Sequence, residues 1–274
     1  VRGAHFFTEA GRVKFWGVNT CFAGNFPEHA DAEKVAAHLA KLGLNAVRFH
    51  HHDTSPAPRG IWGPVVDGKR TISAAQVERQ DYFLNELHRH GLYANLNLHV
   101  GRALLEAEGF PRQDLPYSTR MDKYLLYFEP QARAALKQFA RDYLLHVNPY
   151  RRLRRVDDPG IAMIEITNEN SFSKLGPEIA AALPEPHRGE FKRQWNAWLA
   201  RHYADTAALR KTWGGSNEVL GATLADSAAW QTGLGAWRMK QTREFPVAAR
   251  FGQAGPEVNV PALRLEPQGG AADL

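Results

Sequence analysis

Short apolar runs alternate with longer amphipathic segments through the first 213 residues of the chain. The apolar runs have the length of buried strands, and they predict β-strands at 13–19, 45–50, 93–99 and 160–167. The segments after them carry apolar residues at helical spacing and predict helices at 31–42, 73–90, 130–147, 188–203 and 205–213. Strands this apolar are covered on both faces, so the alternation predicts an α/β fold with a parallel sheet.

Polar and glycine residues mark the ends of the predicted helices. Ser73 is a suitable N-cap, while Gly43 and Gly91 are typical of the position just after a helix ends. A parallel sheet of this kind forms either a (β/α)8 barrel or an open doubly wound sheet. No strand is followed by a G-x-G-x-x-G turn, which disfavours the dinucleotide-binding version of the open sheet. We predict a (β/α)8-type barrel of which the first four or so strand–helix units are visible, a half barrel.

The composition changes after Trp213, which predicts a boundary between residues 1–213 and residues 214–274. The second part is rich in Gly, Ala, Pro and Thr, and it shows no persuasive helical period after about residue 230. It contains short β-like pieces, such as "FPVAARF" at 245–251 and "VPALRLEP" at 260–267. We therefore expect an irregular or β-like tail behind the half barrel.

Polar residues stand at the carboxyl end of each of the four predicted strands. Parallel strands bring these ends to one edge of the sheet, where the chemistry of such folds collects. In chain order the candidate site residues are Asn19, Arg48, His50, His51, Asn97, His99, Asn168, Glu169 and Asn170. Arg48 interrupts an apolar strand and would be costly to bury without an anion, so we expect an ion pair, for which Glu165 is the candidate partner.

Several of these candidates also have a purely structural interpretation. Asn19 is able to cap a turn, and His99 is able to serve as a hydrogen-bonded core histidine. The run His50–His52 is typical of a polar loop, although His50 and His52 could both face the edge of the sheet. Glu169 taken alone could be a structural carboxylate.

The stretch "IEITNENS" at 164–171 places Glu169 between two asparagines, just after a buried strand. A carboxylic acid that stays protonated near neutral pH can protonate the leaving oxygen of a glycosidic bond, and partial desolvation at a barrel mouth raises its pKa. An adjacent asparagine can bind the sugar hydroxyl beside the reacting carbon without adding charge. The pattern therefore favours general acid and base catalysis by Glu169.

At this point the chain resembles the clan A glycoside hydrolases, and within them it is similar to family 5, which includes cellulases and mannanases. The resemblance rests on Arg48, on His99 in "NLNLH", and on the pair Asn168–Glu169. The segment "WNAWLARHYADTAALRKTWG" at 195–214 also resembles a helical segment after strand four in such enzymes.

The resemblance implies a (β/α)8 barrel that hydrolyses β-linked poly- or oligosaccharides by a retaining two-carboxylate mechanism. It implies that Glu169 is the acid/base and that Arg48 and His99 line the subsite of bond cleavage. It implies no cofactor and no metal. The remaining candidates would contact the carbohydrate substrate, namely Asn19, His50, His51, Asn97 and Asn170.

The chain departs from the family pattern after Glu169. The family needs a second glutamate, the nucleophile, at the end of strand seven, and no later glutamate follows a fifth and sixth strand–helix unit. The tail weakly resembles the start of an inserted β-sandwich carbohydrate-binding module. We therefore expect impaired activity, and a fragment, a truncated product or a barrel completed by association. The exposed edge of a half barrel favours a homo-oligomer.

Two other functions compete with this one. The first is a metal-dependent barrel hydrolase with His50, His52 and His99 as ligands. The second is a noncatalytic carbohydrate binder that holds a sugar against aromatic residues such as Trp16 or Trp62.

Charge and hydropathy narrow the list of partners. The net charge of +5 is spread along the chain apart from "YRRLRR" at 150–155, which is typical of a solvated loop, so we expect no nucleic-acid partner. No apolar stretch approaches the roughly 18 residues of a membrane span, so we expect no membrane partner. The start of the chain lacks the pattern of a secretion signal, and a secreted or periplasmic location would require a leader.

Overall fold

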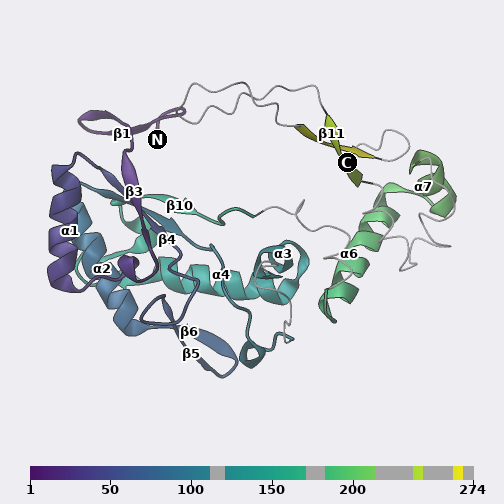
Figure 1. Ribbon diagram of the computed structural model, residues 1–274, viewed down its shortest axis with the longest axis horizontal. Helices are drawn as coiled ribbons and strands as arrows, with labels where there is room; N and C mark the ends of the chain where they lie inside the picture. The colour runs from purple at the N-terminus through teal and green to yellow at the C-terminus, as the bar shows by residue number, and fades with distance from the viewer. Residues whose placement is uncertain (112–120, 171–182, 214–236, 243–261, 268–274) are drawn as a thin grey trace. The chain divides into compact units, whose positions relative to one another are not determined.

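The fold is seen in a computed structural model, which describes residues 1–111, 121–170, 183–213, 237–242 and 262–267 (Figure 1). The chain divides into two units, Val1–Phe172 and Ser173–Leu274. The candidate site residues all belong to the first unit. The boundary predicted at residue 213 from composition stays a prediction.

A sheet of four parallel strands organises the first unit (Figure 1). Its strands are β3 (Gly17–Cys21), β4 (Ala46–His50), β7 (Tyr93–Asn97) and β10 (Ile161–Glu165). They lie side by side in chain order, β3-β4-β7-β10, and every neighbouring pair is parallel. A doubly wound sheet reverses its strand order at a switch point, whereas a barrel adds strands in sequence. The prediction of a partial (β/α) barrel is confirmed.

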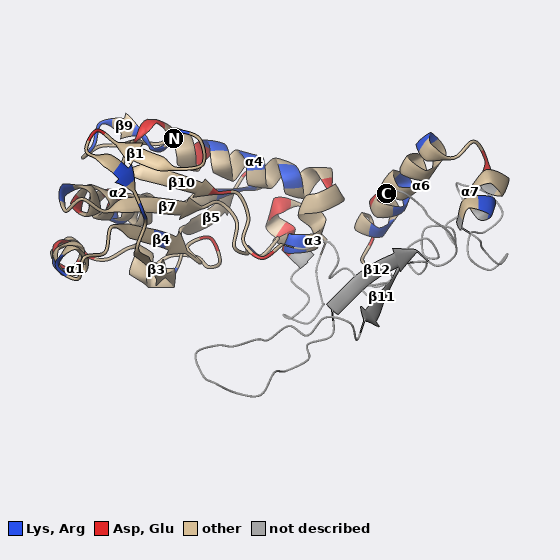
Figure 2. Ribbon diagram, turned by 90° about the horizontal axis from the view of Figure 1, so that it is seen from above, with Lys and Arg blue, Asp and Glu red and all other residues tan. Residues whose placement is uncertain are grey.

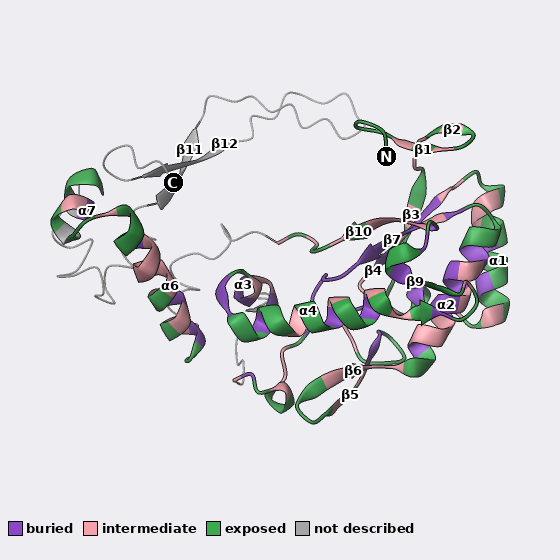
Figure 3. Cartoon of the chain, turned by 180° about the vertical axis from the view of Figure 1, so that it is seen from behind, coloured by how far each residue is buried: buried purple, intermediate pink, exposed green. Residues whose placement is uncertain are grey.

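Three helices cover the same face of this sheet, namely α1 (His29–Lys41), α2 (Ala74–Arg89) and α4 (Pro130–Leu145). The sheet contributes Val47, Phe49, Ala94 and Leu96 to one core, and the helices contribute Ala32, Ala36, Phe83, Leu87, Phe139 and Tyr143. Burial is concentrated on β4, β7 and the inner sides of the helices (Figure 3). Ser73 caps α2 by accepting a hydrogen bond from the Gln76 amide, as predicted.

The opposite face of the sheet is polar because side chains alternate along a strand. It carries Arg48 and His50 on β4 and Asn97 on β7. On β10 a bulge between Ile161 and Met163 interrupts the alternation, so that Ile161 pairs with Ala94 but Glu165 pairs with Asn97. Residues four apart on a regular strand share a face, and the extra residue moves Glu165 onto the polar side. The bulge thereby places a carboxylate opposite Arg48.

The first strand begins later than the sequence suggested. The prediction of a strand at 13–19 is wrong in its bounds, because β3 begins at Gly17. Residues Gly11–Val13 instead form β2, which pairs with β1 (Phe6–Thr8) in a separate hairpin. The backbone between β2 and β3 is hydrogen-bonded to the side chain of Asn45. This side chain accepts from the Trp16 amide at 2.7 Å and donates to the Lys14 carbonyl at 2.8 Å. These bonds take the place of ladder bonds to β4.

The loops that follow β4 and β7 contain secondary structure that the apolar pattern did not predict. The loop after β4 holds the hairpin β5 (Trp62–Val66) and β6 (Lys69–Ile72). Asp67 and Gly68 occupy its turn with φ of 49° and 72°, as a two-residue Asp-Gly hairpin turn requires. The loop after β7 holds the short helix η2 (Glu106–Glu108) and the helix α3 (Met121–Phe128).

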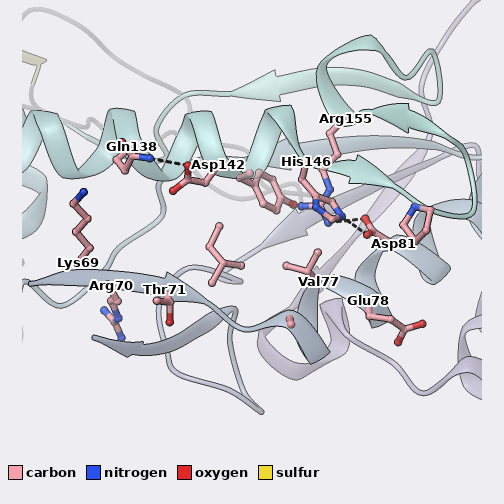
Figure 4. A pocket seen from close by; sticks show the side chains of 14 residues that line it. Lys69, Arg70, Thr71, Val77, Glu78, Asp81, Gln138, Asp142, His146 and Arg155 are labelled. Carbon is pink, nitrogen blue, oxygen red and sulfur yellow. Dashed lines mark hydrogen bonds and ion pairs between the residues drawn. The ribbon is translucent and has the colours of Figure 1, made fainter. Parts of the chain in front are cut away.

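The basic cluster at 150–155 is not a solvated loop, and that interpretation is wrong for two of its arginines. It spans β9 (Leu153–Arg154), which pairs with β8 (Val147–Asn148), and the start of the short helix η4 (Arg155–Asp157). Arg155 is fully buried, donates to Asp81 at 2.8 Å and stacks on the ring of Tyr143. His146 approaches the same carboxylate, as Figure 4 shows. Arg151 forms a two-pronged ion pair with Asp158.

The second unit contains α6 (His187–His202), α7 (Thr206–Trp213) and a hairpin of β11 (Trp237–Thr242) and β12 (Ala262–Pro267). The two helices and β12 agree with the predicted segments, whereas β11 was not predicted and "FPVAARF" lies outside the described residues. Basic residues lie at intervals along α4 and α6 rather than in one patch (Figure 2). No helix in the described ranges is long and apolar enough to cross a membrane.

We expect Arg155→Met to destabilise the first unit by about 3 kcal/mol, because it leaves the buried Asp81 without its arginine. Urea unfolding measures the loss. Arg154→Met is the matched control: Arg154 is exposed and forms a surface ion pair with Asp157, so its removal should leave the unfolding midpoint close to that of the parent chain. Equal midpoints for the two variants would contradict a structural role for Arg155.

Candidate functional site

A hydrogen-bonded cluster joins three neighbouring strands on the polar face of the sheet. Arg48 on β4 forms a two-pronged ion pair with Glu165 on β10, with bonds of 2.8 and 2.7 Å. Asn97 on β7 donates to the same carboxylate at 2.7 Å, and His50 bonds the Asn97 side chain at 2.7 Å. The predicted partnership of Arg48 and Glu165 is therefore confirmed.

The ion pair sets the protonation of the cluster. The hydrogen bonds from Arg48 hold the pKa of Glu165 below its ordinary value, against the opposing effect of burial. An ionised carboxylate can only accept, so Asn97 turns its Nδ2 toward Glu165 and its Oδ1 toward His50. His50 must then donate from Nδ1, and its Nε2 is the ring nitrogen that makes no bond to Asn97. The charge of Arg48 is balanced within the cluster.

Asn168, just beyond β10, is anchored by three of its groups. Its side-chain Oδ1 accepts from Arg48 at 2.9 Å, and its amide donates to the His99 carbonyl at 2.8 Å. Its own carbonyl accepts from Lys123 on α3 at 2.7 Å. These bonds leave the side-chain Nδ2 of Asn168 to face other partners.

Glu169 follows in a left-handed conformation with φ = 51°. This region costs a residue other than glycine about 1–2 kcal/mol, and it persists where the surrounding structure fixes it. The bonds to Asn168 provide that constraint. The side chain of Glu169 is exposed and has no hydrogen bond or ion pair within the described ranges. The expectation of a carboxyl partly desolvated at a barrel mouth stays a prediction, because the described sheet has four parallel strands.

His99 is brought to the cluster by its backbone but not by its side chain. The ring is 1% exposed, and its Nε2 donates to Asp122 on α3 at 3.2 Å. Its Nδ1 bonds Thr167 at 3.3 Å. Of the two interpretations from sequence, the described structure shows the hydrogen-bonded core histidine, and the predicted contact with substrate stays a prediction.

The other candidates are distributed around this cluster. Asn19 does not end its strand as predicted but lies within β3, exposed and in register with Arg48. His51 stacks on Phe22 with ring centroids 4.8 Å apart. Asn170 is the last residue before a stretch outside the described ranges.

Three residues considered for other functions are placed elsewhere. His52 is buried and donates to the Asn97 carbonyl, so it does not face the edge of the sheet, and burial lowers its pKa. Trp62 is buried in the core and does not belong to the Arg48 cluster. Trp16 is 70% exposed but precedes β3, at the opposite end of the strand from the cluster.

The metal-dependent alternative gains no support from the geometry. Within the described ranges no group of three or more His, Cys, Asp or Glu side chains is arranged to hold a metal ion. The three histidines proposed as ligands are engaged with Asn97, with its backbone and with Asp122.

Asp122 and Lys123 are the site-supporting residues that sequence reasoning missed. Both lie on α3, and the bonds that matter run to residues 23 and 45 positions away. The amphipathic pattern of "MDKYLLYF" could have indicated the helix. No local signal indicates which strand end it supports.

No protein-family model matches the chain. No curated protein sequence matches it either.

Several solved structures are similar to the chain at low sequence identity. An endo-1,4-β-mannanase from Rhizomucor miehei is 17% identical over 66% of this chain and 54% of its own, with a TM-score of 0.49. A glycoside hydrolase family 5 mannosidase from the same organism is 16% identical over 60% of this chain and 47% of its own, with a TM-score of 0.44. An exo-β-1,4-mannosidase from Opitutaceae bacterium strain TAV5 is 19% identical over 82% of this chain and 35% of its own, with a TM-score of 0.39. The chain spans about half the length of the first two structures.

Removing the arginine should release the carboxyl of Glu165. We expect Arg48→Gln to raise the pKa of Glu165 toward its ordinary value and to cost about 2 kcal/mol at neutral pH. A carboxyl whose folded pKa is depressed stabilises the fold above its unfolded pKa, and this contribution is lost as the pH falls through the folded pKa. The variant should therefore lose less stability in acid than the parent chain.

The measurement is a 13C titration of the Glu165 carboxyl together with urea unfolding from neutral to acidic pH. Arg79→Gln is the control, because Arg79 forms an ion pair with the largely exposed Glu28. An unchanged Glu165 titration in Arg48→Gln would refute the assignment.

We expect Lys123→Met to loosen the turn that carries Glu169. Loss of about 1 kcal/mol of hydrogen bonding should speed amide exchange at Asn168 roughly fivefold. Lys137→Met, at an exposed position of α4, is the control and should leave that rate unchanged. Unaltered exchange at Asn168 in Lys123→Met would show that the bond from Lys123 does not hold the turn.

Proposed function

We propose that the cluster of Arg48, Asn168 and Glu169 is the acid/base half of a retaining glycosidase site for β-linked poly- or oligosaccharides. The observation that carries the proposal is the anchoring of Asn168 by Arg48, beside a carboxylate held in a left-handed turn. An asparagine fixed in this way keeps its Nδ2 in a constant place relative to Glu169. Constant geometry of this kind is what proton transfer to a bound substrate requires.

The chemistry of the cluster suits an uncharged sugar. The charge of Arg48 is balanced by Glu165, and the groups available to a ligand include the side-chain amide of Asn168 and one nitrogen of His50. Amide and imidazole groups bind hydroxyls by hydrogen bonds without demanding a charge on the ligand. Glu169, exposed beside them, is the group that would donate a proton to the leaving oxygen.

The second carboxylate of a retaining mechanism has no place on the described sheet. That sheet ends with β10, so the described residues include no seventh parallel strand to carry a nucleophile. Of the later glutamates, Glu266 lies on the antiparallel strand β12, and Glu257 is outside the described residues. We propose further that the barrel is completed by further chain or by a second copy, added beside β10 at the edge of the described sheet.

Noncatalytic carbohydrate binding is the alternative that the same cluster allows. Its polar groups can bind sugar hydroxyls without any second carboxylate. Binding without turnover is then the expected behaviour, so the function must be tested by affinity as well as by hydrolysis.

We expect the 274-residue chain to bind β-linked oligosaccharides but to show little or no hydrolysis. Loss of one member of a two-carboxylate unit usually lowers the rate by several orders of magnitude. Calorimetry with gluco- and manno-oligosaccharides measures binding, and aryl glycosides with soluble glucans and mannans measure turnover. Asn168→Ala should weaken binding at least about fivefold, the effect of losing about 1 kcal/mol of hydrogen bonding.

The control variants separate the possible outcomes. Glu169→Ala should leave binding within about threefold of the parent, because its carboxylate acts on the leaving oxygen. Robust hydrolysis that Glu169→Ala abolishes would support the acid/base role and overturn the expected lack of turnover. Neither binding nor hydrolysis of any glycan would contradict the proposed function.

A further inference from the structure

A cavity away from the Arg48 cluster carries more positive than negative charge. It has a volume of about 270 Å³ and lies between β6, the segment that contains η2, and α4. Trp62, Phe110 and Phe139 form its aromatic wall. None of its lining residues belongs to the cluster around Arg48.

This cavity adjoins a second one of about 570 Å³, with which it shares Lys69, Arg70, Ile72, Gln138 and Asp142. Figure 4 shows Lys69 and Arg70 at the end of the larger cavity opposite Asp81, His146 and Arg155. The two ends differ in charge balance. Arg155 at one end has Asp81 as its counter-ion, so the question is what balances Arg70 at the other.

Neither carboxylate around the smaller cavity forms an ion pair with Arg70 in the described residues. Its lining holds three cations, Lys69, Arg70 and Arg102, and two carboxylates, Glu108 and Asp142. Glu108 is bonded to Arg102, and Asp142 accepts from the Gln138 amide at 2.7 Å. Arg70 has one hydrogen bond, to the Ala103 carbonyl at 3.2 Å. A carbonyl oxygen carries no net charge, so no carboxylate is hydrogen-bonded to Arg70 in the described residues; Glu108 and Asp53 attract it only at longer range.

The guanidinium groups are poorly solvated. Arg102 is only 6% exposed, and the Nε atoms of both Arg70 and Arg102 are buried without a hydrogen-bond partner in the described structure. Both guanidinium groups lie over the Trp62 ring, with their Cζ atoms 4.8 and 4.5 Å from its centre. Burial and the charge of Arg102 lower the pKa of Arg70 to about 10, against the opposing effect of the Glu108 and Asp53 carboxylates. A cation withdrawn from water without a partner is costly, and an anion removes that cost.

We propose that this cavity binds a small organic oxyanion, with its carboxylate or phosphate group on Arg70 and its apolar part against Trp62 and Phe110. The planar guanidinium fork matches both kinds of oxyanion in geometry. The volume is just below the range of pockets for drug-sized ligands, which fits a ligand of one ring. The site is independent of the proposed glycosidase chemistry.

The test follows the Nε–H signals of the arginines by 1H–15N NMR while ligands are added to the whole chain. Benzoate and phenyl phosphate are the organic probes, inorganic phosphate tests the anion alone, and benzamide is the neutral analogue of benzoate. We expect saturable shifts of the Arg70 and Arg102 signals with at least one organic anion, and none with benzamide. A response to one organic anion only identifies the preferred oxyanion.

Two variants of Arg70 and one control complete the experiment. Arg70→Gln should weaken binding at least about tenfold, and Arg70→Lys should restore part of it, because lysine keeps the charge but not the fork. Arg79→Gln, on the surface of α2, should bind like the parent chain. Thermal unfolding shows whether each variant is folded. If Arg70→Gln does not fold, the affinity of Arg70→Lys tests the proposal.

Absence of saturable shifts with every anion, or equal affinity in the parent chain and in a folded Arg70 variant, would overturn the proposal. Equal binding of benzamide would overturn the role of the charge. Shifts that depend on inorganic phosphate alone, and that sodium chloride removes in proportion to ionic strength, would show general screening rather than a site and would also overturn it.

Discussion

The ion pair between Arg48 and Glu165 is the interaction on which the candidate site depends. It connects the second and fourth strands of the sheet across Asn97, and it leaves Arg48 with a further donor for Asn168. A buried or half-buried arginine is tolerable only with a well-aligned anion, and the bulge on β10 is what turns Glu165 to the same face. One extra residue in a strand thus decides whether the polar face is a neutral hydrogen-bonded surface or an unbalanced charge.

The loops complete what the strands begin. Residue Lys123 on α3 and the backbone of His99 hold Asn168 from two further directions, and the left-handed Glu169 follows this anchored residue. Such a conformation carries a cost that the neighbouring bonds must offset. The polar face of the sheet and α3 therefore act together: the strands set the direction of the side chains, and α3 fixes the turn that follows the last strand.

Charge balance also distinguishes the two ends of the larger cavity, which Arg155 and Arg70 both line. Arg155 is fully buried yet paired with Asp81 and stacked on Tyr143, so it joins α2 and α4 to the segment before β10. Arg70 has a comparable aromatic neighbour in Trp62 but only a carbonyl as its hydrogen-bond partner. Similar residues in similar packing thus have different consequences, because a carboxylate is hydrogen-bonded to the guanidinium of Arg155 and, in the described residues, none is hydrogen-bonded to that of Arg70.

The amino-acid sequence by itself determined the parallel sheet, its helical cover and the polar strand ends. Apolar runs and helical spacing are local, and burial of Val47, Phe49, Ala94 and Leu96 against the helices is what that pattern requires. The pairing of Arg48 with Glu165 followed from the same reasoning, since a charge in an apolar strand demands a partner.

Tertiary structure alone decided the rest, because it depends on residues far apart in the chain. Parity along a strand does not reveal a bulge, so only the pairing of β10 with β7 shows which face Glu165 occupies. Whether His99 meets a ligand or Asp122, and whether Arg155 is solvated or buried, depends on helices whose packing no short window records. The side chains with the strongest chemistry were visible in the sequence, but their partners were set by the three-dimensional contacts that stabilise or expose them.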